Sequence, residues 1–257
     1  MAASPGSAPI SSTSSDASPE IRPRRLIYGR RIGPRLRPRR RRLLEERLPA
    51  LRLDLDDPRR ARIDPRALFP GREAFELEIG FGGGEHLVWQ AAQHPERGYV
   101  GVEPYLGGVA KLLAALEEAG LDNVRVVVDD ARLLLPRLPD ASFLRIHVLF
   151  PDPWPKKRHH KRRIVNRVTV AEFARLLAPG GELRLATDDP GYARWMLEAA
   201  LAEPRLAWLA ERARDWRERP ADWPETRYEA KARRQGRRPV FLRFRRRAEG
   251  ARAEEGP

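Results

Sequence analysis

Short apolar runs recur through the central part of the chain, and segments with helical spacing of apolar residues separate them. Apolar runs bounded by turn residues predict buried strands, whereas apolar residues three and four positions apart predict amphipathic helices. The predicted strands span residues 75–79, 99–102, 124–128, 143–149, 182–187 and 240–244. The predicted helices span residues 85–93, 106–119, 166–177 and 192–201. Gly120 ends the second helix, and Pro179-Gly180-Gly181 closes the third.

Strands and helices alternate along this region. Because neighbouring parallel strands need a crossover connection, the alternation predicts an α/β fold with a mostly parallel central sheet and helices on both faces. We place the folded domain at residues 75–247. Residues 43–74 are expected to form a linker and an N-terminal helical region, and residues 248–257 a disordered tail.

The N-terminal region has a different composition. Residues 1–20 are mostly Ala, Ser, Pro and Thr, with almost nothing to bury. Residues 22–42 are dense in arginine and contain no acidic side chain. We therefore expect residues 1–42 to form a disordered basic arm. Its arginines would either lie along phosphates or be solvated, and the sequence favours neither.

The chain of 257 residues carries 50 basic and 36 acidic side chains, a formal charge of +14. That excess favours a polyanionic partner such as nucleic acid. Nearly all the cations are arginine, however, and a biased genome composition would produce the same excess without any role in binding.

Cysteine is absent, which excludes disulfides, thiolate metal sites and cysteine nucleophiles. No apolar run is long enough to cross a bilayer, and the N-terminus lacks the apolar core of a secretion signal. A Ser- and Arg-rich N-terminus also suits a transit peptide, although Asp16 and Glu20 argue against one. We therefore expect a cytoplasmic protein.

The most informative segment spans residues 150–163 and reads Phe-Pro-Asp-Pro-Trp-Pro-Lys-Lys-Arg-His-His-Lys-Arg-Arg. It follows a predicted strand, so Asp152 is expected at the carboxyl end of the sheet, where α/β folds bind ligands. The flanking prolines fix φ and hold this carboxylate in one place. Trp154 offers a flat face for a base, unless it packs in the core, and the cations that follow can meet phosphates. The alternative interpretation is a proline-rich surface loop with a solvated basic tail.

A glycine-rich turn follows the first predicted strand, in the run Glu78-Ile79-Gly80-Phe81-Gly82-Gly83-Gly84. Glycines let the backbone approach a ligand closely, although a structural turn alone would also use them. A dinucleotide fingerprint requires glycine at position 85, which is Glu here. The Glu78 carboxylate would repel a pyrophosphate and attract an ammonium or a sulfonium. The pattern therefore favours S-adenosylmethionine over NAD as the cofactor.

Acidic residues also follow the second and third predicted strands. Glu103 comes directly after the second strand, where such folds hold the hydroxyls of a ribose. Asp129 and Asp130 follow the third strand, where an acid often meets the amino group of adenine. An acid at a single strand end is common in any sheet. Acids after three successive strands, with a glycine turn, favour one cofactor site.

Taken together, these segments resemble the bacterial tRNA (guanine-N7-)-methyltransferases, which are class I S-adenosylmethionine-dependent enzymes with a Rossmann-like fold. The resemblance covers residues 75–244 and rests above all on residues 150–163. It rests further on Glu78-Ile79-Gly80-Phe81-Gly82, Gly101-Val102-Glu103, Ala186-Thr187-Asp188 and Thr226-Arg227-Tyr228-Glu229. The family's last motif usually reads Thr-Lys-Phe-Glu-x-Arg-Gly, whereas residues 226–232 read Thr-Arg-Tyr-Glu-Ala-Lys-Ala here. Charge and aromaticity are kept, and the glycine is lost.

The resemblance implies transfer of a methyl group from S-adenosylmethionine to N7 of guanine 46 in the variable loop of tRNA. It implies Asp152 as the catalytic residue. The implied cofactor-binding residues are Glu78, Gly80, Gly82, Glu103, Asp130 and Asp152. The implied substrate-binding residues are Lys156, Asp188, Thr226, Arg227, Tyr228 and Glu229. The implied RNA-binding residues are Arg158, His159, His160, Lys161, Arg162 and Arg163.

The residues also suit this reaction on chemical grounds. Guanine N7 is an in-plane lone pair with no proton to remove, so methyl transfer needs alignment more than a strong base. A fixed carboxylate such as Asp152 would stabilise the positive charge that develops on the purine, or accept from guanine N1 and N2. Trp154 or Tyr228 would stack on the base. His159 and His160 are expected to face RNA or solvent, and we expect no metal because a third ligand is missing.

Two other functions stay open. An amino-group methyltransferase for DNA or protein uses a related polar-Pro-Pro-aromatic turn, which Trp154 and the cationic run disfavour. A non-catalytic RNA-binding protein with a decayed fold would not need the acids at positions 78, 103, 130 and 152. The expected partner is tRNA and not a membrane, with the chain as a monomer or a dimer. Trp216 and Trp223 are expected to pack a small C-terminal lobe.

Overall fold

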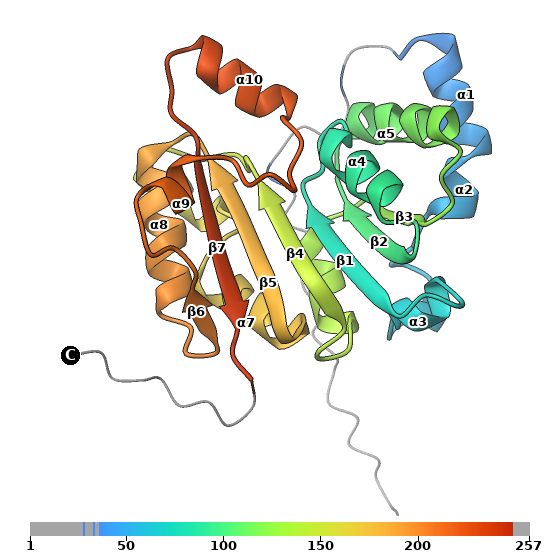
Figure 1. The fold of residues 1–257 in the computed structure, drawn as a ribbon. Helices are drawn as coiled ribbons and strands as arrows, with labels where there is room; N and C mark the ends of the chain where they lie inside the picture. The colour runs from blue at the N-terminus through green and yellow to red at the C-terminus, as the bar shows by residue number, and fades with distance from the viewer. Residues whose placement is uncertain (1–27, 29–32, 34–35, 249–257) are drawn as a thin grey trace, which may run out of the picture.

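A seven-stranded sheet forms the centre of the computed structural model, which describes residues 28, 33 and 36–248 (Figure 1). The strands follow the order β3-β2-β1-β4-β5-β7-β6. Their bounds are β1 Ala74–Ile79, β2 Arg97–Val102, β3 Val124–Val127, β4 Phe143–Leu149, β5 Leu177–Thr187, β6 Leu206–Trp208 and β7 Val240–Arg246. β1 to β5 pair in parallel, whereas β7 lies antiparallel between β5 and β6. The predicted α/β fold with a mostly parallel sheet is confirmed.

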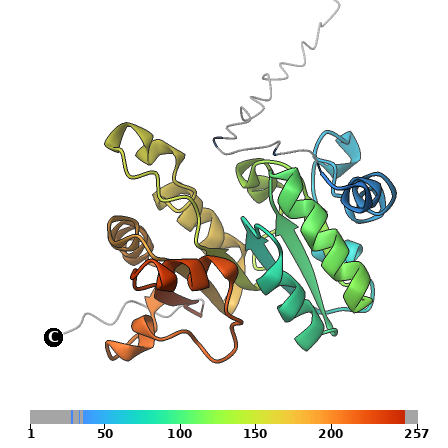
Figure 2. The same cartoon turned by 90° about the horizontal axis from the view of Figure 1, so that it is seen from above.

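Helices connect the strands and cover both faces of the sheet (Figure 1). The α-helices are α1 Pro38–Glu46, α2 Leu48–Leu51, α3 Pro65–Leu68, α4 Glu85–Gln93, α5 Leu106–Ala119, α6 Ala131–Leu134, α7 Arg167–Leu176, α8 Pro190–Leu201, α9 Arg214–Arg217 and α10 Arg227–Arg234. The short 3-10 helices of the described residues are η1 Pro58–Arg60, η2 Leu135–Arg137 and η3 Lys157–Arg162. Seen from above, α5, α10 and the segment with η3 surround the carboxyl ends of the parallel strands (Figure 2).

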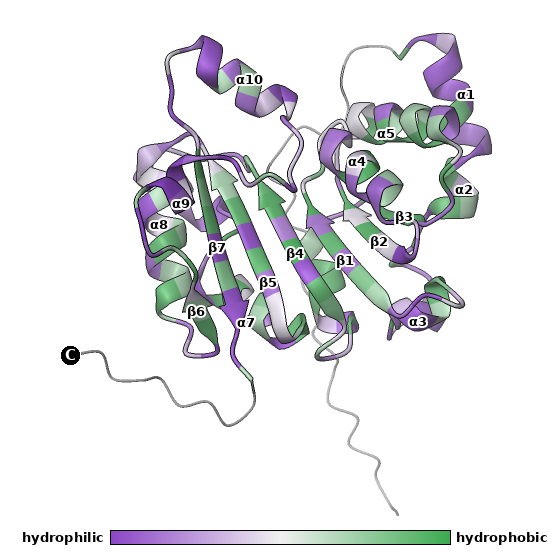
Figure 3. Ribbon diagram, viewed as in Figure 1, coloured by the Kyte–Doolittle hydropathy of each residue, from purple (hydrophilic) through white to green (hydrophobic). Residues whose placement is uncertain are grey.

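Two main apolar layers form the core, one on each face of the sheet. Val100 and Val102 of β2 belong to the layer packed against α7 and α8, whereas Tyr99 belongs to the layer packed against α4 and α5. This division follows from the strand itself, because successive side chains point to opposite faces. The strands are largely hydrophobic, yet hydrophilic residues interrupt β1, β4 and β5 (Figure 3).

The folded part begins earlier than the sequence predicts. α1 starts at Pro38, inside the segment 1–42 that was assigned to the arm. Between residues 43 and 74, the buried apolar side chains include Leu43, Leu48, Leu53, Leu55, Ile63 and Phe69. The Leu53 amide also donates to the Val126 carbonyl at 2.8 Å, which joins this segment to the edge strand β3. Residues 43–74 therefore belong to the core, while residues 1–27, 29–32 and 34–35 of the predicted arm and the tail at 249–257 lie outside the described residues.

One predicted helix end is wrong. α7 ends at Leu176, and Leu177 already pairs with Phe143 as the first residue of β5. Pro179-Gly180-Gly181, predicted to close the helix, therefore lies within β5, where the register against β4 shifts. The apolar spacing alone did not separate the last helical turn from the first strand residues, because both bury leucines. β6, α9 and α10 were not predicted.

Candidate active site

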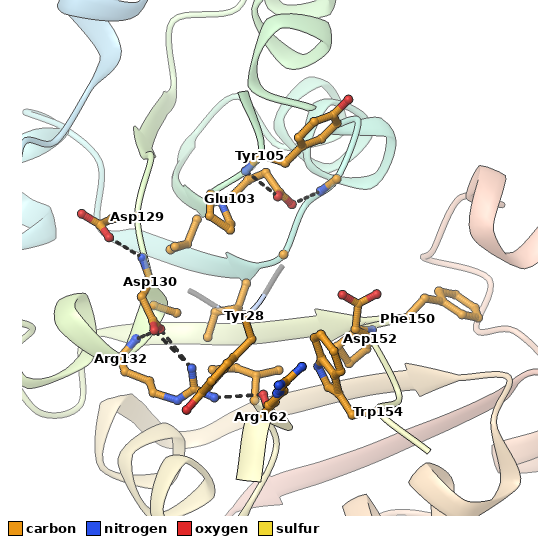
Figure 4. Close-up of a pocket in the computed structure, with 18 of the residues that line it drawn as sticks. Tyr28, Glu103, Tyr105, Asp129, Asp130, Arg132, Phe150, Asp152, Trp154 and Arg162 are labelled. Carbon is orange, nitrogen blue, oxygen red and sulfur yellow. Dashed lines mark hydrogen bonds and ion pairs between the residues drawn. The ribbon is translucent and has the colours of Figure 1, made fainter. Parts of the chain in front are cut away.

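A cavity of about 460 Å³ opens at the carboxyl ends of β1, β2, β3 and β4 (Figure 4). That volume lies within the range of sites for small molecules. Residues that follow four strands line it together, among them Gly80, Gly82, Glu103, Asp129, Asp130 and Asp152. The structure thus brings together the glycine turn and the acids that the sequence placed after the second, third and fourth predicted strands.

The glycine turn forms one wall of the cavity. Gly80 and Gly82 have left-handed φ angles of 75° and 58°, which a side chain would strain. A Cβ at Gly108 would lie 2.1 Å from the Gly82 carbonyl oxygen, so α5 packs directly against the turn. Glu103 accepts hydrogen bonds from the Gly82 amide at 2.8 Å and the Tyr105 amide at 3.0 Å. Backbone groups therefore orient this carboxylate, while burial raises its pKa.

Asp129 and Asp130 line the cavity beyond the end of β3 (Figure 4). Asp130 caps α6 by accepting from the Arg132 amide at 3.0 Å, and it pairs with the Arg132 guanidinium at 3.2 Å. The Asp129 carboxylate accepts from the Asp130 amide at 2.8 Å. Asp130 therefore has a structural task, the capping of α6, in addition to its place in the cavity wall.

Asp152 projects from the loop after β4 at the mouth of the cavity (Figure 4). Phe150 and Trp154, on either side of it, have left-handed φ angles of 51° and 45°. Aromatic residues keep such angles only where their neighbours hold the loop. Here the Phe150 amide donates to a β5 carbonyl at 2.8 Å, and the Pro153 carbonyl accepts from Arg163 Nε at 2.8 Å. Asp152 stays exposed, yet the surrounding protein displaces enough water to raise the pKa of its carboxyl.

Trp154 lines the cavity and does not pack in the core. The Arg162 guanidinium lies 4.8 Å from its ring centre and 5.2 Å from the ring centre of Tyr28, and Figure 4 shows Arg162 between the two rings. Stacking of a guanidinium on aromatic faces is favourable. Tyr28 belongs to the arginine-dense arm and was not predicted as a site residue. An aromatic side chain among arginines is the only sequence signal that could have suggested it.

The predicted RNA-binding residues do not share one environment. Arg158 and Lys161 are exposed on η3, as is Lys156 just before it, whereas His159 and His160 are half-buried. His159 meets the Trp154 ring edge-on at 5.9 Å, and His160 meets Trp195 at 5.4 Å.

Arg163, which was predicted to bind RNA, is buried instead of facing solvent. Its side chain is 3 % exposed and lies 4.8 Å from the ring centre of Tyr192 and 5.0 Å from that of Trp195. With its hydrogen bond to the Pro153 carbonyl, Arg163 anchors the loop of Asp152 from inside. The sequence shows Arg163 only as one more cation of a basic run. Its burial depends on the rings of Tyr192 and Trp195, which come near it only in the folded protein.

The predicted substrate-binding residues likewise separate into two groups. Tyr228 lines the cavity, and Arg227 stacks on it at 4.8 Å. Thr226 caps α10, and the buried Glu229 carboxylate lies between Arg219 at 3.2 Å and Arg233 at 2.9 Å. Asp188 pairs with Arg237 at 2.8 Å. None of the three residues Thr226, Glu229 and Asp188 lines the cavity. They support the segment that carries Arg227 and Tyr228.

The sequence model described as "Putative methyltransferase" matches residues 72–242. A tRNA (guanine-N(7)-)-methyltransferase of Rhodospirillum rubrum is 55 % identical over 88 % of this chain and 89 % of its own length. The protein of the same name from Nitrobacter hamburgensis is 47 % identical over 95 % of this chain and 96 % of its own length. The chain belongs to the tRNA (guanine-N(7)-)-methyltransferase family.

Among solved structures, the 16S rRNA methyltransferase KamB aligns with a TM-score of 0.49 and 16 % identity. The alignment covers 71 % of this chain and 92 % of KamB.

In this member of the tRNA (guanine-N(7)-)-methyltransferase family, Glu78 does not line the cavity. Its carboxylate is buried and lies 2.7 Å from Nδ1 of His86. The His86 ring lies 4.6 Å, centre to centre, from the ring of His147 of β4 and is tilted against it, and Nε2 of His147 lies 2.8 Å from Glu76. Neither histidine was predicted as a site residue, because each meets its acid only across the fold.

Within residues 36–248 and at positions 28 and 33, no three His, Asp or Glu side chains cluster in a way that would hold a metal ion. No helix in the same part of this family member has the length and apolar character of a membrane span.

Proposed function

We propose that the protein transfers a methyl group from S-adenosylmethionine to N7 of guanine 46 in the variable loop of tRNA. The observation that carries the proposal is Asp152, a carboxylate held at the mouth of an acid-lined cavity beside Trp154 and exposed cations. The names of the relatives support tRNA and guanine N7 as the targets. Position 46 rests on the resemblance of the sequence motifs alone. A tRNA substrate also favours the cytoplasm as the place of the reaction.

The residues around the cavity fit S-adenosylmethionine. Two backbone amides orient Glu103, and the carboxylate oxygens keep lone pairs that can accept from the hydroxyls of a ribose. Gly80 and Gly82 have no side chain, so the backbone of the turn can approach the polar tail of the ligand at these positions. When bound, the cofactor supplies a methyl group activated by a sulfonium. The acids of the wall favour that positive charge electrostatically.

Asp152 is assigned to the guanine side of the reaction. Because N7 carries a lone pair in the ring plane, no residue has to remove a proton before transfer. Asp152 accepts from the N1 and N2 donors of guanine and stabilises the charge that develops on the purine. The hydrogen bonds that hold its loop keep the carboxylate in place, so little reorganisation is needed during the reaction.

The rings and cations at the mouth suit a base that has left its stack. Trp154 and Tyr228 both line the cavity, and a base between them gains about 1–3 kcal/mol from each stacking contact. Arg158 and Lys161 of η3 and Lys156 before it are exposed beside this entrance. Phosphates on either side of the flipped guanine would meet these cations.

The test is incubation of the purified full chain with methyl-labelled S-adenosylmethionine and unmodified tRNA, followed by nucleoside analysis. We expect label in 7-methylguanosine and, after borohydride reduction and aniline treatment, strand cleavage at position 46. A matched transcript with adenine at position 46 should stay unlabelled. Label in an N-methylated amino group, or in protein, would contradict the proposal and favour an amino-group methyltransferase. Binding of tRNA without any methyl transfer would favour a non-catalytic RNA-binding protein.

A further inference from the structure

A buried hydrogen bond closes the glycine turn between β1 and α4. Glu78 stands one residue before the end of β1, and His86 lies in the first turn of α4. Nδ1 of His86 is 2.7 Å from Oε2 of Glu78, and their side chains are 2 % and 5 % exposed. All the glycines of the turn lie between these two residues. Their hydrogen bond therefore fixes the distance that the turn has to span.

The remaining partners of His86 assign its proton. Nε2 of Gln90 donates to the Asp222 carbonyl at 2.8 Å and lies 3.2 Å from Nε2 of His86. An amide nitrogen only donates, so Nε2 of His86 accepts, and Nδ1 carries the proton that Glu78 accepts. One directed chain of hydrogen bonds thus leads from Gln90 through His86 to the end of β1.

The same series of hydrogen bonds reaches the C-terminal part of the protein at Asp222. Asp222, whose carbonyl binds Gln90, pairs through its carboxylate with Arg184 at 2.8 Å. A few residues further on, α10 carries Tyr228, whose ring packs over the glycine turn. A Cβ added at Gly82 would lie only 2.9 Å from the Tyr228 ring. His86 therefore lies where the turn, the sheet and the segment that carries Tyr228 meet.

We propose that His86 is a positioning residue for the cofactor site. It does not line the cavity and acts through Glu78 on the turn. The Gly82 amide of that turn donates to Glu103 at 2.8 Å, so a displaced turn would also displace the carboxylate assigned to the ribose. Glu78 accordingly transmits the position of His86 to the turn. The inference rests on the proposed function for the identity of that cofactor.

His86→Asn and His86→Gln form a matched pair of test variants. The amide of Asn sits near the position of Nδ1 and still donates to Glu78, whereas the amide of Gln sits near Nε2 and reaches Gln90 instead. His94→Asn is the control, because His94 follows the same helix, is partly exposed and pairs only with Glu96 among the described residues.

Binding of S-adenosylmethionine is measured by calorimetry on the full chain without tRNA. We expect His86→Gln to raise the Kd about tenfold or more, as for one lost hydrogen bond to a charged group. His86→Asn should recover most of that affinity, and His94→Asn should bind like the wild type. At saturating cofactor, kcat and the KM for tRNA should stay within about twofold of the wild type in all three variants.

Equal cofactor affinity in His86→Asn and His86→Gln would overturn the inference. So would a parallel loss of cofactor and tRNA affinity with a lowered Tm, since that pattern belongs to a merely structural residue. Cofactor binding is measured apart from catalysis. A wild-type chain that binds S-adenosylmethionine and forms no 7-methylguanosine would therefore contradict the proposed function. The effect of the His86 variants on cofactor binding would still test the role of His86. A wild-type chain that fails to bind the cofactor would contradict both.

Discussion

Glu103 and Asp152 are carboxylates of the same cavity wall with different surroundings. Glu103 is buried, and two backbone amides orient it. Asp152 is exposed, and among the described residues it has neither a hydrogen-bond donor nor an ion-pair partner. A carboxylate that is held by its loop but bound by no neighbour is available to a substrate. This difference supports the roles proposed for Glu103 at the cofactor and for Asp152 at the guanine.

Replacing Asp152 by Asn keeps the shape and removes the charge. Turnover at saturating substrates should fall about 10²-fold or more, the usual effect of losing one preorganised electrostatic group. The pKa of Asp152 is raised, so the wild-type rate should decline on acidification at a higher pH than an ordinary aspartate would cause. The variant should lack this decline. Steady-state kinetics across pH measure both effects.

Asp140→Asn is the matched control, since Asp140 is 73 % exposed and pairs with Arg175 at the surface. Its kinetics should match the wild type at every pH. Near-normal turnover in a folded Asp152→Asn variant would remove Asp152 from the mechanism.

At the scale of elements, η3 carries the basic run, and its two ends face different surroundings. Arg158 near its start is exposed to solvent. Arg162 at its end lines the cavity and stacks on Trp154 and Tyr28. One short helix therefore presents cations both to an incoming phosphate and to the inner wall of the site.

Alanine at each of these two positions should produce different defects. Arg158→Ala removes one phosphate contact, so the dependence of log K on log salt should weaken by about 0.7 to 0.9 while saturated turnover stays normal. Arg162→Ala loosens Trp154 and Tyr28. Because a misplacement of about 1 Å can cost 10²-fold in rate, turnover at saturating tRNA should fall.

Filter binding of tRNA across a salt series, together with single-turnover kinetics, distinguishes the two arginine variants. If Arg158→Ala lost saturated turnover and Arg162→Ala kept it, the roles assigned to the two ends of η3 would be reversed.

At the scale of the whole molecule, a series of ion pairs crosses one face of the sheet. It runs from β2 through β1, β4 and β5 to β7, with Asp222 as a bridge, and consists of Arg97, Glu76, Arg145, Asp222, Arg184, Glu182 and Arg245. Parallel strands usually bury apolar residues on both faces. Charges in this position are tolerated only while every partner is present, so the stability of the sheet depends on their protonation.

His147 and Glu76 make this dependence measurable. Burial lowers the pKa of His147 from 6.5 to about 4. Burial opposes ionisation of Glu76, but the hydrogen bonds from His147 and Arg97 and the charges of His147 and Arg145 outweigh it and lower its pKa from 4.5 to about 2. Both groups bind protons more readily in the unfolded chain. Stability is therefore lost as pH falls, from 6.5 to 4 through His147 and from 4.5 to 2 through Glu76.

His147→Gln keeps an N–H donor for Glu76 and cannot titrate. Between pH 7 and 5 the wild type should lose about 2 kcal/mol more free energy of unfolding than this variant, since one unit of pKa corresponds to about 1.4 kcal/mol. Urea unfolding at the two pH values measures the difference. Parallel losses in both proteins would show that His147 does not control the acid sensitivity.

Much of this architecture could be predicted from local patterns. Alternating apolar runs and helical spacings identified the parallel strands and their crossover helices, because burial on a sheet imposes those periods directly. The same order places residues after successive strands at one edge of the sheet. The sequence therefore predicted that Gly80, Gly82, Glu103, Asp130 and Asp152 would lie at one site, and all five line the cavity.

The tertiary structure decided what depends on contacts between distant segments. Tyr28 reached the cavity from the N-terminal arm, Arg163 was buried by Tyr192 and Trp195, and Glu78 was bound by His86 instead of facing the cavity. The spacing of apolar residues along the sequence does not indicate which partner a charged side chain will contact. An ion pair or a stacked ring forms between residues that the fold brings close in space. Sequence alone therefore determined the fold class and the edge that carries the site. Packing across the fold decided which charged side chains face the cavity and which hold it in shape.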